Sequence, residues 1–421
     1  MNQVHVIGAG LAGLSAALSL SAAGRQVVIH EAGPAAGGRC RSYFDRELDL
    51  KIDNGNHLLL SGNRAAFAYI DEIGSRDRFH LPRQARFPFV DLKTGDRWTL
   101  RPNRGPIPWW ILLGNRRVPD TRLADYLGMA GIVRIKDDTV VAESMRRGRL
   151  YWRLVEPLAI AALNTRPQAA LARSLGAVMR ETLARGGKAC IPTFPTEGLS
   201  DALIDPAISL LESRGATVHF SHRVGRLTIE ADRVTALRVG TTQIDLVPGD
   251  AVVLAVPPWV AADLLPDLTV PDEFEAILNV HFRVNADPDG PAGDAGFVGV
   301  LEGAAEWVFV KPNHVSVTIS AANRMVDDEA RAIAATVWPN VCAALDIAPG
   351  PGEPIPPFRV VKEKRATFAA TAEQEVRRPA ARTRLVNLAL AGDWTATGLP
   401  ATIEGAIRSG RTAARVLLDA V

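Results

Sequence analysis

The sequence is poor in cysteine, in long apolar runs and in net charge. Cys40, Cys190 and Cys342 are the only cysteines among 421 residues, and their odd number and wide spacing fit neither a disulfide framework nor a CxxC pair or metal cluster. No stretch reaches the roughly 18 apolar residues of a membrane-spanning helix. A formal charge of +2 gives no overall field that favours nucleic acid. We therefore expect a reducing compartment, no metal site and no nucleic-acid partner.

Residues 4–33 have the pattern of a dinucleotide-binding unit. A short apolar strand leads into Gly8, Gly10 and Gly13, and a helix rich in alanine and leucine follows. In such a unit the first glycine permits a tight turn, the second lets the backbone approach a pyrophosphate, and the third lets the helix pack on the strand. Because the chain begins on this strand, we expect no cleavable signal peptide and a cytoplasmic location.

The flanks of the glycine turn complete the predicted nucleotide site. The start of the helix, at Leu11 and Ala12, offers unpaired N–H groups and a positive dipole end to phosphates. A second strand, residues 27–29, leads to Glu31 and Ala32. A carboxylate at this place can accept hydrogen bonds from ribose hydroxyls and would repel a 2′-phosphate. Residues 8–13 and 31–32 are therefore predicted to bind a nucleotide.

A second glycine motif, residues 36–42, continues from the Glu31 strand. Gly38 and Arg39 can place backbone N–H groups and a guanidinium on the other side of a pyrophosphate. Dinucleotide-binding units for NAD rarely carry this extension. It resembles the flavoproteins of the amine oxidase and carotenoid desaturase superfamily, and the resemblance implies FAD.

The C-terminal end supplies a third motif of the same superfamily. A buried-type strand stops at Gly392 and Asp393, and a helix begins near residues Ala401, Thr402 and Ile403. The resemblance implies that Asp393 binds the ribitol or phosphate region and that the helix N-terminus points at the N1/O2 edge of the flavin, where negative charge develops. Together with the two N-terminal motifs, this C-terminal motif predicts FAD as the cofactor.

The resemblance covers essentially the whole chain and implies an α/β fold, in which a Rossmann-like FAD-binding domain of the amine oxidase type carries an inserted α+β substrate domain. Val224 resembles the position whose backbone meets the adenine. The FAD domain is expected to consist of residues 1–62, 190–260 and 381–421, and the substrate domain of residues 63–189 and 261–380.

A narrower resemblance comes from residues 53–60, DNGNHLLL. This run, the strand-like residues 277–282 and the pair Asp393-Trp394 look like the squalene-associated flavoproteins, the hydroxysqualene dehydroxylases of hopanoid biosynthesis. That family implies the reduction of an allylic C30 isoprenoid alcohol to squalene by reduced flavin. The superfamily also implies that Gly55, Asn56 and His57 pass beside the isoalloxazine ring.

Removing an allylic hydroxyl requires an acid for the leaving oxygen and a hydride for the carbon. His57 is the first candidate acid because its intrinsic pKa lies nearest neutrality. Asp53 would orient His57, or serve instead if burial raises its pKa. A purely structural His57 stays equally open, and His281 is better explained as a structural histidine. Since no second GxGxxG unit appears in the sequence, the electrons must come from an external donor or from a nicotinamide that docks directly on the flavin, and the sequence does not choose between them.

Residues 101–153 combine apolar and basic character. They contain 11 Lys/Arg and 5 Asp/Glu, and Trp109 and Trp110 lie in an apolar stretch just before Arg116 and Arg117. Tryptophan at an apolar boundary beside cations is typical of a peripheral membrane contact, here at the inner face of the cell membrane. The alternative is an ordinary helix that packs its tryptophans inward.

Two other functions stay open at this point. The first is another enzyme of the superfamily, a carotenoid-type desaturase or an amine oxidase, although only 4 tyrosines disfavour the aromatic cage of an amine oxidase. The second is a non-enzymatic prenyl-binding escort protein of the same fold, against which the intact motifs at Arg39 and Asp393 argue.

Overall fold

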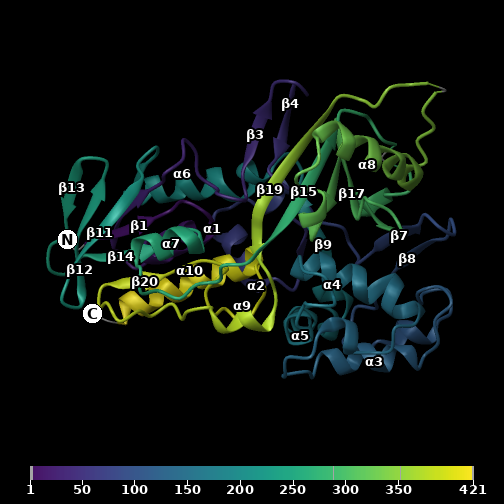
Figure 1. Ribbon diagram of the computed structural model, residues 1–421, viewed down its shortest axis with the longest axis horizontal. Coiled ribbons are helices and arrows are strands. Elements are labelled where there is room, and N and C mark those ends of the chain that lie inside the picture. The colour runs from purple at the N-terminus through teal and green to yellow at the C-terminus, as the bar shows by residue number, and fades with distance from the viewer. Residues whose placement is uncertain (1–2, 288, 351, 420–421) are drawn as a thin grey trace.

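The computed structural model describes residues 3–287, 289–350 and 352–419, which form two lobes linked by two long strands (Figure 1). The first lobe contains a parallel five-stranded sheet in the order β10-β2-β1-β14-β20. The strands are β1 (Gln3–Ile7), β2 (Gln26–His30), β10 (Thr217–His219), β14 (Ala251–Leu254) and β20 (Leu388–Leu390). They come from the three stretches of sequence expected to form the FAD domain.

Both faces of this sheet are covered, which explains why its central strands are almost wholly apolar. Helices α1 (Leu11–Ala22), α6 (Asp205–Ser213) and α10 (Ile403–Leu418) pack on one face. Helix α7 (Pro258–Leu264) and a small antiparallel sheet cover the other. That sheet consists of β11 (Val224–Glu230), β12 (Arg233–Val239) and β13 (Thr242–Asp245).

Small residues let α1 and α10 approach each other closely. A side-chain carbon added at Gly410 would lie 2.2 Å from the carbonyl oxygen of Ala12. On α10 the buried residues Ile403, Ile407, Ala414 and Leu417 recur at intervals of three, four and seven, the spacing of one helical face. Chain ends about 400 residues apart are thereby fixed side by side at the predicted nucleotide site.

The second lobe is built on a seven-stranded sheet in the order β19-β15-β18-β17-β16-β7-β8. Its pairs are antiparallel except for β16 with β7. One face packs against α8 (Ala330–Leu345), which lies at the upper right in Figure 1. The strands are β7 (Phe87–Asp91), β8 (Arg97–Leu100), β15 (Phe274–Phe282), β16 (Phe297–Leu301), β17 (Trp307–Lys311), β18 (His314–Ile319) and β19 (Phe358–Phe368).

Three short helices pack beneath the β7–β8 end of that sheet and share a core with its aromatic side chains. They are α3 (Asp125–Ile132), α4 (Glu156–Leu163) and α5 (Ala172–Glu181). Strands β3 (Ser42–Asp45) and β4 (Leu50–Asp53) form a two-stranded sheet. A three-stranded sheet consists of β5 (Leu59–Leu60), β9 (Pro192–Pro195) and β6 (Phe79–His80). The other α-helices of the described residues are α2 (Arg64–Glu72) and α9 (Ala372–Val376). None of the helices in the described ranges is both long and apolar enough to cross a bilayer.

Candidate functional site

The turn between β1 and α1 has steric requirements that only glycine meets. Gly8 has a φ of +104°, and a side-chain carbon there would lie 2.5 Å from the carbonyl oxygen of Ala255. A side-chain carbon on Gly13 would lie 1.9 Å from the Gly8 carbonyl oxygen. At Gly10 the same carbon would meet no atom within 4 Å of the described protein. The first and third glycines therefore build the turn, while the second faces open space.

The motif at residues 36–42 lies directly against that turn. The Gly37 N–H donates to the Ala9 carbonyl oxygen at 2.9 Å, and Gly37 and Gly10 form an isolated bridge. Next to them, the Arg39 guanidinium donates to Asp393 Oδ1 at 2.7 Å and to the Ala366 carbonyl oxygen at 2.6 Å. Motifs from both ends of the chain therefore meet at one place.

Glu31 reaches back to the glycine turn. Its carboxylate accepts hydrogen bonds from the Ala9 N–H at 2.8 Å and the Gly33 N–H at 2.7 Å. Beside it the Glu31 N–H donates to the carbonyl oxygen of His219, and the chain continues to the buried Val224 at the start of β11. Ala32 is exposed. The residues predicted for the adenosine half thus lie along one edge of the sheet.

The first turn of α10 forms the opposite boundary. The Thr402 side chain caps the helix by accepting from the Gly405 N–H at 3.0 Å, between the half-buried Ala401 and the buried Ile403. The Gly392 N–H donates to Ser409 Oγ at 2.8 Å, which ties the Asp393 turn to the same helix. By contrast, the N-cap Gly10 gives α1 no side-chain cap within the described chain, so its first N–H groups stay available for a phosphate.

Residues 53–57 bring the two lobes together. Asn56 Nδ2 donates to Ser316 Oγ at 2.7 Å and to Thr318 Oγ1 at 3.0 Å, both on β18. A side-chain carbon on Gly55 would lie 2.9 Å from the amide nitrogen of Asn279 on β15. These polar partners were missed in the sequence, although polar residues at alternate positions of otherwise apolar strands are the signal that could have revealed them.

His57 lies beside Cys40, with 3.8 Å between Nε2 and Sγ. Burial lowers the pKa of His57, and the nearby Asp53 charge opposes that shift. The Asp53 carboxylate is itself buried and accepts from the Ser42 hydroxyl at 2.7 Å and the Leu199 N–H at 2.8 Å. Among the described residues no hydrogen bond joins Asp53 to His57, so Asp53 acts on His57 through its charge and fixes the loop through Ser42.

His281 is completely buried on β15. Its Nδ1 lies 2.9 Å from Ser316 Oγ, the hydroxyl that also accepts from Asn56. Burial, followed by the charges of His314 and Lys311, lowers its pKa to about 3. Its Nε2 is buried and has no hydrogen-bond partner among the described residues, so the structural role of His281 stays a prediction.

A cavity of about 780 Å³ lies at the β7–β8 end of the second sheet, between the β16–β17 turn and α4. Phe89, Ile160 and Trp307 are among its apolar lining residues, and Glu306 is among its acidic ones. Trp307 pairs in register with Thr318, the residue that bonds Asn56. Burial raises the pKa of Glu306 to about 7, so this carboxyl group exchanges protons near neutrality.

The two adjacent tryptophans of the basic region point in opposite directions. Trp110 is 7% exposed and packs edge-on against Tyr126 in the helical core. Trp109 is 47% exposed and lies under the Arg116 guanidinium. Ile107 and Leu112 next to it are 75% and 64% exposed. The predicted pair therefore separates into one core residue and one surface residue.

The sequence profile described as flavin containing amine oxidoreductase matches residues 11–286 and 309–418. An oxidoreductase from Methanosarcina mazei has a similar structure, with a TM-score of 0.72, 16% identity and coverage of 97% of this chain and 98% of the other. The chain is therefore an α/β flavoprotein of the amine oxidase superfamily, which confirms the predicted fold class.

Hydroxysqualene dehydroxylases match the chain over its full length. The protein of Rhodopseudomonas palustris is 48% identical over 99% of this chain and 98% of its own. That of Sinorhizobium fredii is 49% identical with the same coverage. The chain belongs to the hydroxysqualene dehydroxylase family.

FAD is the cofactor of this oxidoreductase, as predicted. The protein offers what a dinucleotide requires: an open position over Gly10, an uncapped α1, and a guanidinium at Arg39. Glu31 is already held by two backbone N–H groups, so its carboxylate is oriented in advance. The assignment of individual residues to parts of FAD stays a prediction.

Proposed function

We propose that the protein removes the hydroxyl group of hydroxysqualene and forms squalene. The C–O bond breaks and water leaves, while a C–H bond forms, so one turnover consumes two electrons and two protons. When bound, reduced FAD supplies the hydride from N5. The full-length identity of 48–49% to dehydroxylases carries this proposal, together with the conjunction of the three motifs at Gly10, Arg39 and Asp393.

We assign the proton to the loop at residues 53–57. His57 is proposed to protonate the leaving oxygen, and Asp53 to favour the imidazolium through its charge. Because burial lowers the pKa of His57 below its usual value of about 6.5, the protonated form decreases as the pH rises through a range below that value, and turnover should decrease with it. The anchoring of Asn56 to β18 fixes this loop against the second lobe.

The isoprenoid chain is assigned to the 780 Å³ cavity. Phe89, Ile160 and Trp307 belong to an apolar part of its lining that suits a hydrocarbon. Seven of its sixteen described lining residues are charged, and they give the rest of the cavity a polar wall. The register between Trp307 and Thr318 places one wall of the cavity a single strand away from the residue that holds Asn56. A chain bound there would therefore extend toward the loop that is proposed to flank the flavin.

We further propose peripheral membrane association on the cytoplasmic side. An exposed apolar segment, Ile107, Trp109, Leu112 and Leu113, lies next to Arg116 and Arg117, and aromatic and aliphatic side chains beside cations suit the interface of an anionic bilayer. A C30 hydrocarbon is nearly insoluble in water, so an enzyme at the bilayer surface can exchange substrate and product with the lipid phase.

The direct test is anaerobic incubation of the photoreduced protein with hydroxysqualene, followed by mass analysis of the hydrocarbon product. The proposal predicts stoichiometric squalene from a single turnover and reoxidation of the flavin absorbance. Incubation of the oxidised protein with squalene and with a primary amine tests the opposite direction. Dehydrogenation of either compound, without squalene formation in the first experiment, would replace the dehydroxylase by a desaturase or an amine oxidase.

A further inference from the structure

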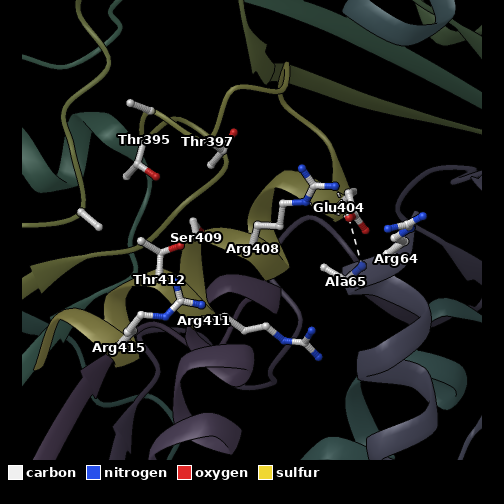
Figure 2. Close-up of a pocket in the computed structure, with 12 residues that line it drawn as sticks. Arg64, Ala65, Thr395, Thr397, Glu404, Arg408, Ser409, Arg411, Thr412 and Arg415 are labelled. Atoms are coloured by element: carbon white, nitrogen blue, oxygen red, sulfur yellow. Dashed lines mark hydrogen bonds and ion pairs between the residues drawn. The ribbon is translucent and has the colours of Figure 1, made fainter. Parts of the chain in front are cut away.

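A second cavity, of about 440 Å³, opens on the outer side of α10. Arg408, Arg411 and Arg415 line it from one side of that helix, and Arg64 lines it from the start of α2. Their guanidinium groups point in different directions and are spread along the cavity (Figure 2). These four residues are called the arginine cleft below. Glu404 is the one carboxylate among the described residues that line the cavity, and it accepts hydrogen bonds from the Ala65 and Ala66 N–H groups and pairs with Arg408.

The arginine cleft carries uncompensated positive charge. Arg408 is paired with Glu181 and Glu404, but among the described residues no carboxylate forms a salt bridge with Arg64, Arg411 or Arg415. Arg411 and Arg415 are four residues apart on one helix face, where like charges destabilise a helix. The helix dipole explains a cation in the last turn, but not Arg408 and Arg411. An anionic partner would remove this repulsion.

The arginine cleft lies directly behind the predicted flavin site. Its wall residue Ser409 accepts from the Gly392 N–H at 2.8 Å, and Gly392 precedes Asp393, the partner of Arg39. Thr395, two residues further on, lines the same cavity. A single hydrogen bond, from Gly392 to Ser409, therefore joins a residue assigned to FAD binding to the wall of the arginine cleft.

The lining also decides which kind of electron donor fits. Hydride transfer from a nicotinamide requires contact with the flavin ring, at about 3–3.5 Å between reacting atoms. No residue of the loop 53–57, which is proposed to flank that ring, lines the cavity. A carrier that passes single electrons does not need such contact, and a protein of this type with an acidic surface complements the guanidinium groups of Arg64, Arg411 and Arg415, for which the described residues offer no carboxylate partner.

We infer that the arginine cleft is the docking site of an acidic one-electron carrier protein, which supplies the reducing equivalents for the dehydroxylation. This inference rests on the proposed function, which consumes two electrons per turnover. Two carrier molecules, each oxidised by one electron, satisfy that demand, and the two protons come from solvent through the protein.

The test uses the purified holoprotein and an acidic [2Fe–2S] ferredoxin that has been reduced and freed of reductant. Anaerobic stopped-flow absorbance measures flavin reduction, and calorimetry measures binding of the oxidised ferredoxin. The double variant Arg411→Glu/Arg415→Glu removes two cations of the cleft. The matched control, Arg324→Glu/Arg331→Glu, makes the same change in net charge at exposed positions on the second lobe. Dithionite serves as a small reductant that needs no docking surface.

In 50 mM salt we expect the cleft variant to be reduced by ferredoxin about 10–100 times more slowly than the wild type, with a matching loss of binding. The difference should nearly vanish at 1 M salt, where the Debye length is about 3 Å. The control variant and all dithionite rates should equal the wild type.

Equal ferredoxin rates in wild type and cleft variant would overturn the inference. So would rapid reduction of the wild type by NADPH that the cleft variant loses, because the cleft would then bind a phosphate-bearing dinucleotide. Failure of dithionite-reduced wild type to form squalene would instead contradict the proposed function, whatever the ferredoxin rates show.

Discussion

The two lobes present their chemistry in different ways. In the first lobe, short contiguous motifs build the site: Gly8 and Gly13 form one turn, and Glu31 returns to the Ala9 N–H in that turn. The motifs of Arg39 and Asp393 meet beside that turn. In the second lobe, the site is assembled from strands distant in sequence, as when Asn56 bonds Ser316. The first arrangement is encoded by short motifs and fixed by the backbone, whereas the second depends on side chains and register.

The difference predicts how each lobe responds to substitution. A backbone cradle fails when a single side chain enters the space reserved for a phosphate, because no neighbour can move aside. A site built of side chains loses function more gradually, since each hydrogen bond contributes only part of the geometry. Four predictions sharpen this contrast, beginning with the largest expected effect.

Gly10→Val should abolish flavin binding and leave the protein folded. A side-chain carbon at Gly10 meets no atom of the described residues within 4 Å, so we expect the fold to accept a side chain there, but the space proposed for the pyrophosphate is then filled. Flavin absorbance per protein after gel filtration measures the effect, with far-ultraviolet circular dichroism as the folding control. Stoichiometric flavin in this variant would show that the site is misplaced.

His57→Ala should keep its flavin spectrum and lose turnover by about 10²–10⁴, the range of general acid catalysis. Glu306→Gln is the informative comparison, because the pKa of Glu306 is raised to about 7 and that of His57 is lowered. If His57 is the acid, the wild-type kcat decreases with rising pH and His57→Ala loses this dependence, while Glu306→Gln retains it. If Glu306→Gln loses the pH dependence of kcat and His57→Ala retains it, Glu306 is the acid.

The predictability of the molecule from its sequence follows the same division. The FAD cofactor and the α/β fold followed from contiguous motifs around Gly10, Arg39 and Asp393, because a backbone cradle requires glycines at fixed spacing. The partners of Asn56 and the hydrogen bonds of Asp53 to Ser42 and Leu199 could not be predicted, since strand register and long-range packing decide them. The arginine cleft likewise depends on how α10 faces α2.

Adjacent tryptophans of the second lobe give a matched pair of variants. Trp110→Ser removes a buried ring that packs on Tyr126 and should destabilise the helical layer by about 3–5 kcal/mol. Trp109→Ser should leave thermal stability nearly unchanged and weaken cosedimentation with anionic vesicles, because its ring is exposed. High salt should weaken wild-type binding without abolishing it, since only the arginine contribution is screened. Unchanged vesicle binding of Trp109→Ser would contradict the membrane proposal.

The smallest expected effect is the pH dependence contributed by His281. Its folded-state pKa of about 3 lies below the unfolded value near 6.5, so between these values the unfolded chain binds the extra proton. The stability due to neutral His281 is therefore complete above pH 6.5 and decreases as the pH falls, by about 1 kcal/mol between pH 6.5 and 5.5.

His281→Gln should lower Tm at pH 7.5 but reduce the further fall of Tm on acidification. His80→Gln, at a partly exposed histidine, is the control and should retain the wild-type slope. Equal acid sensitivity of His281→Gln and the wild type would show that other groups cause the pH dependence. The next group to substitute would be the row of His5, His30 and His222 in the first lobe, because burial and neighbouring histidines also lower the pKa of His30 to about 3.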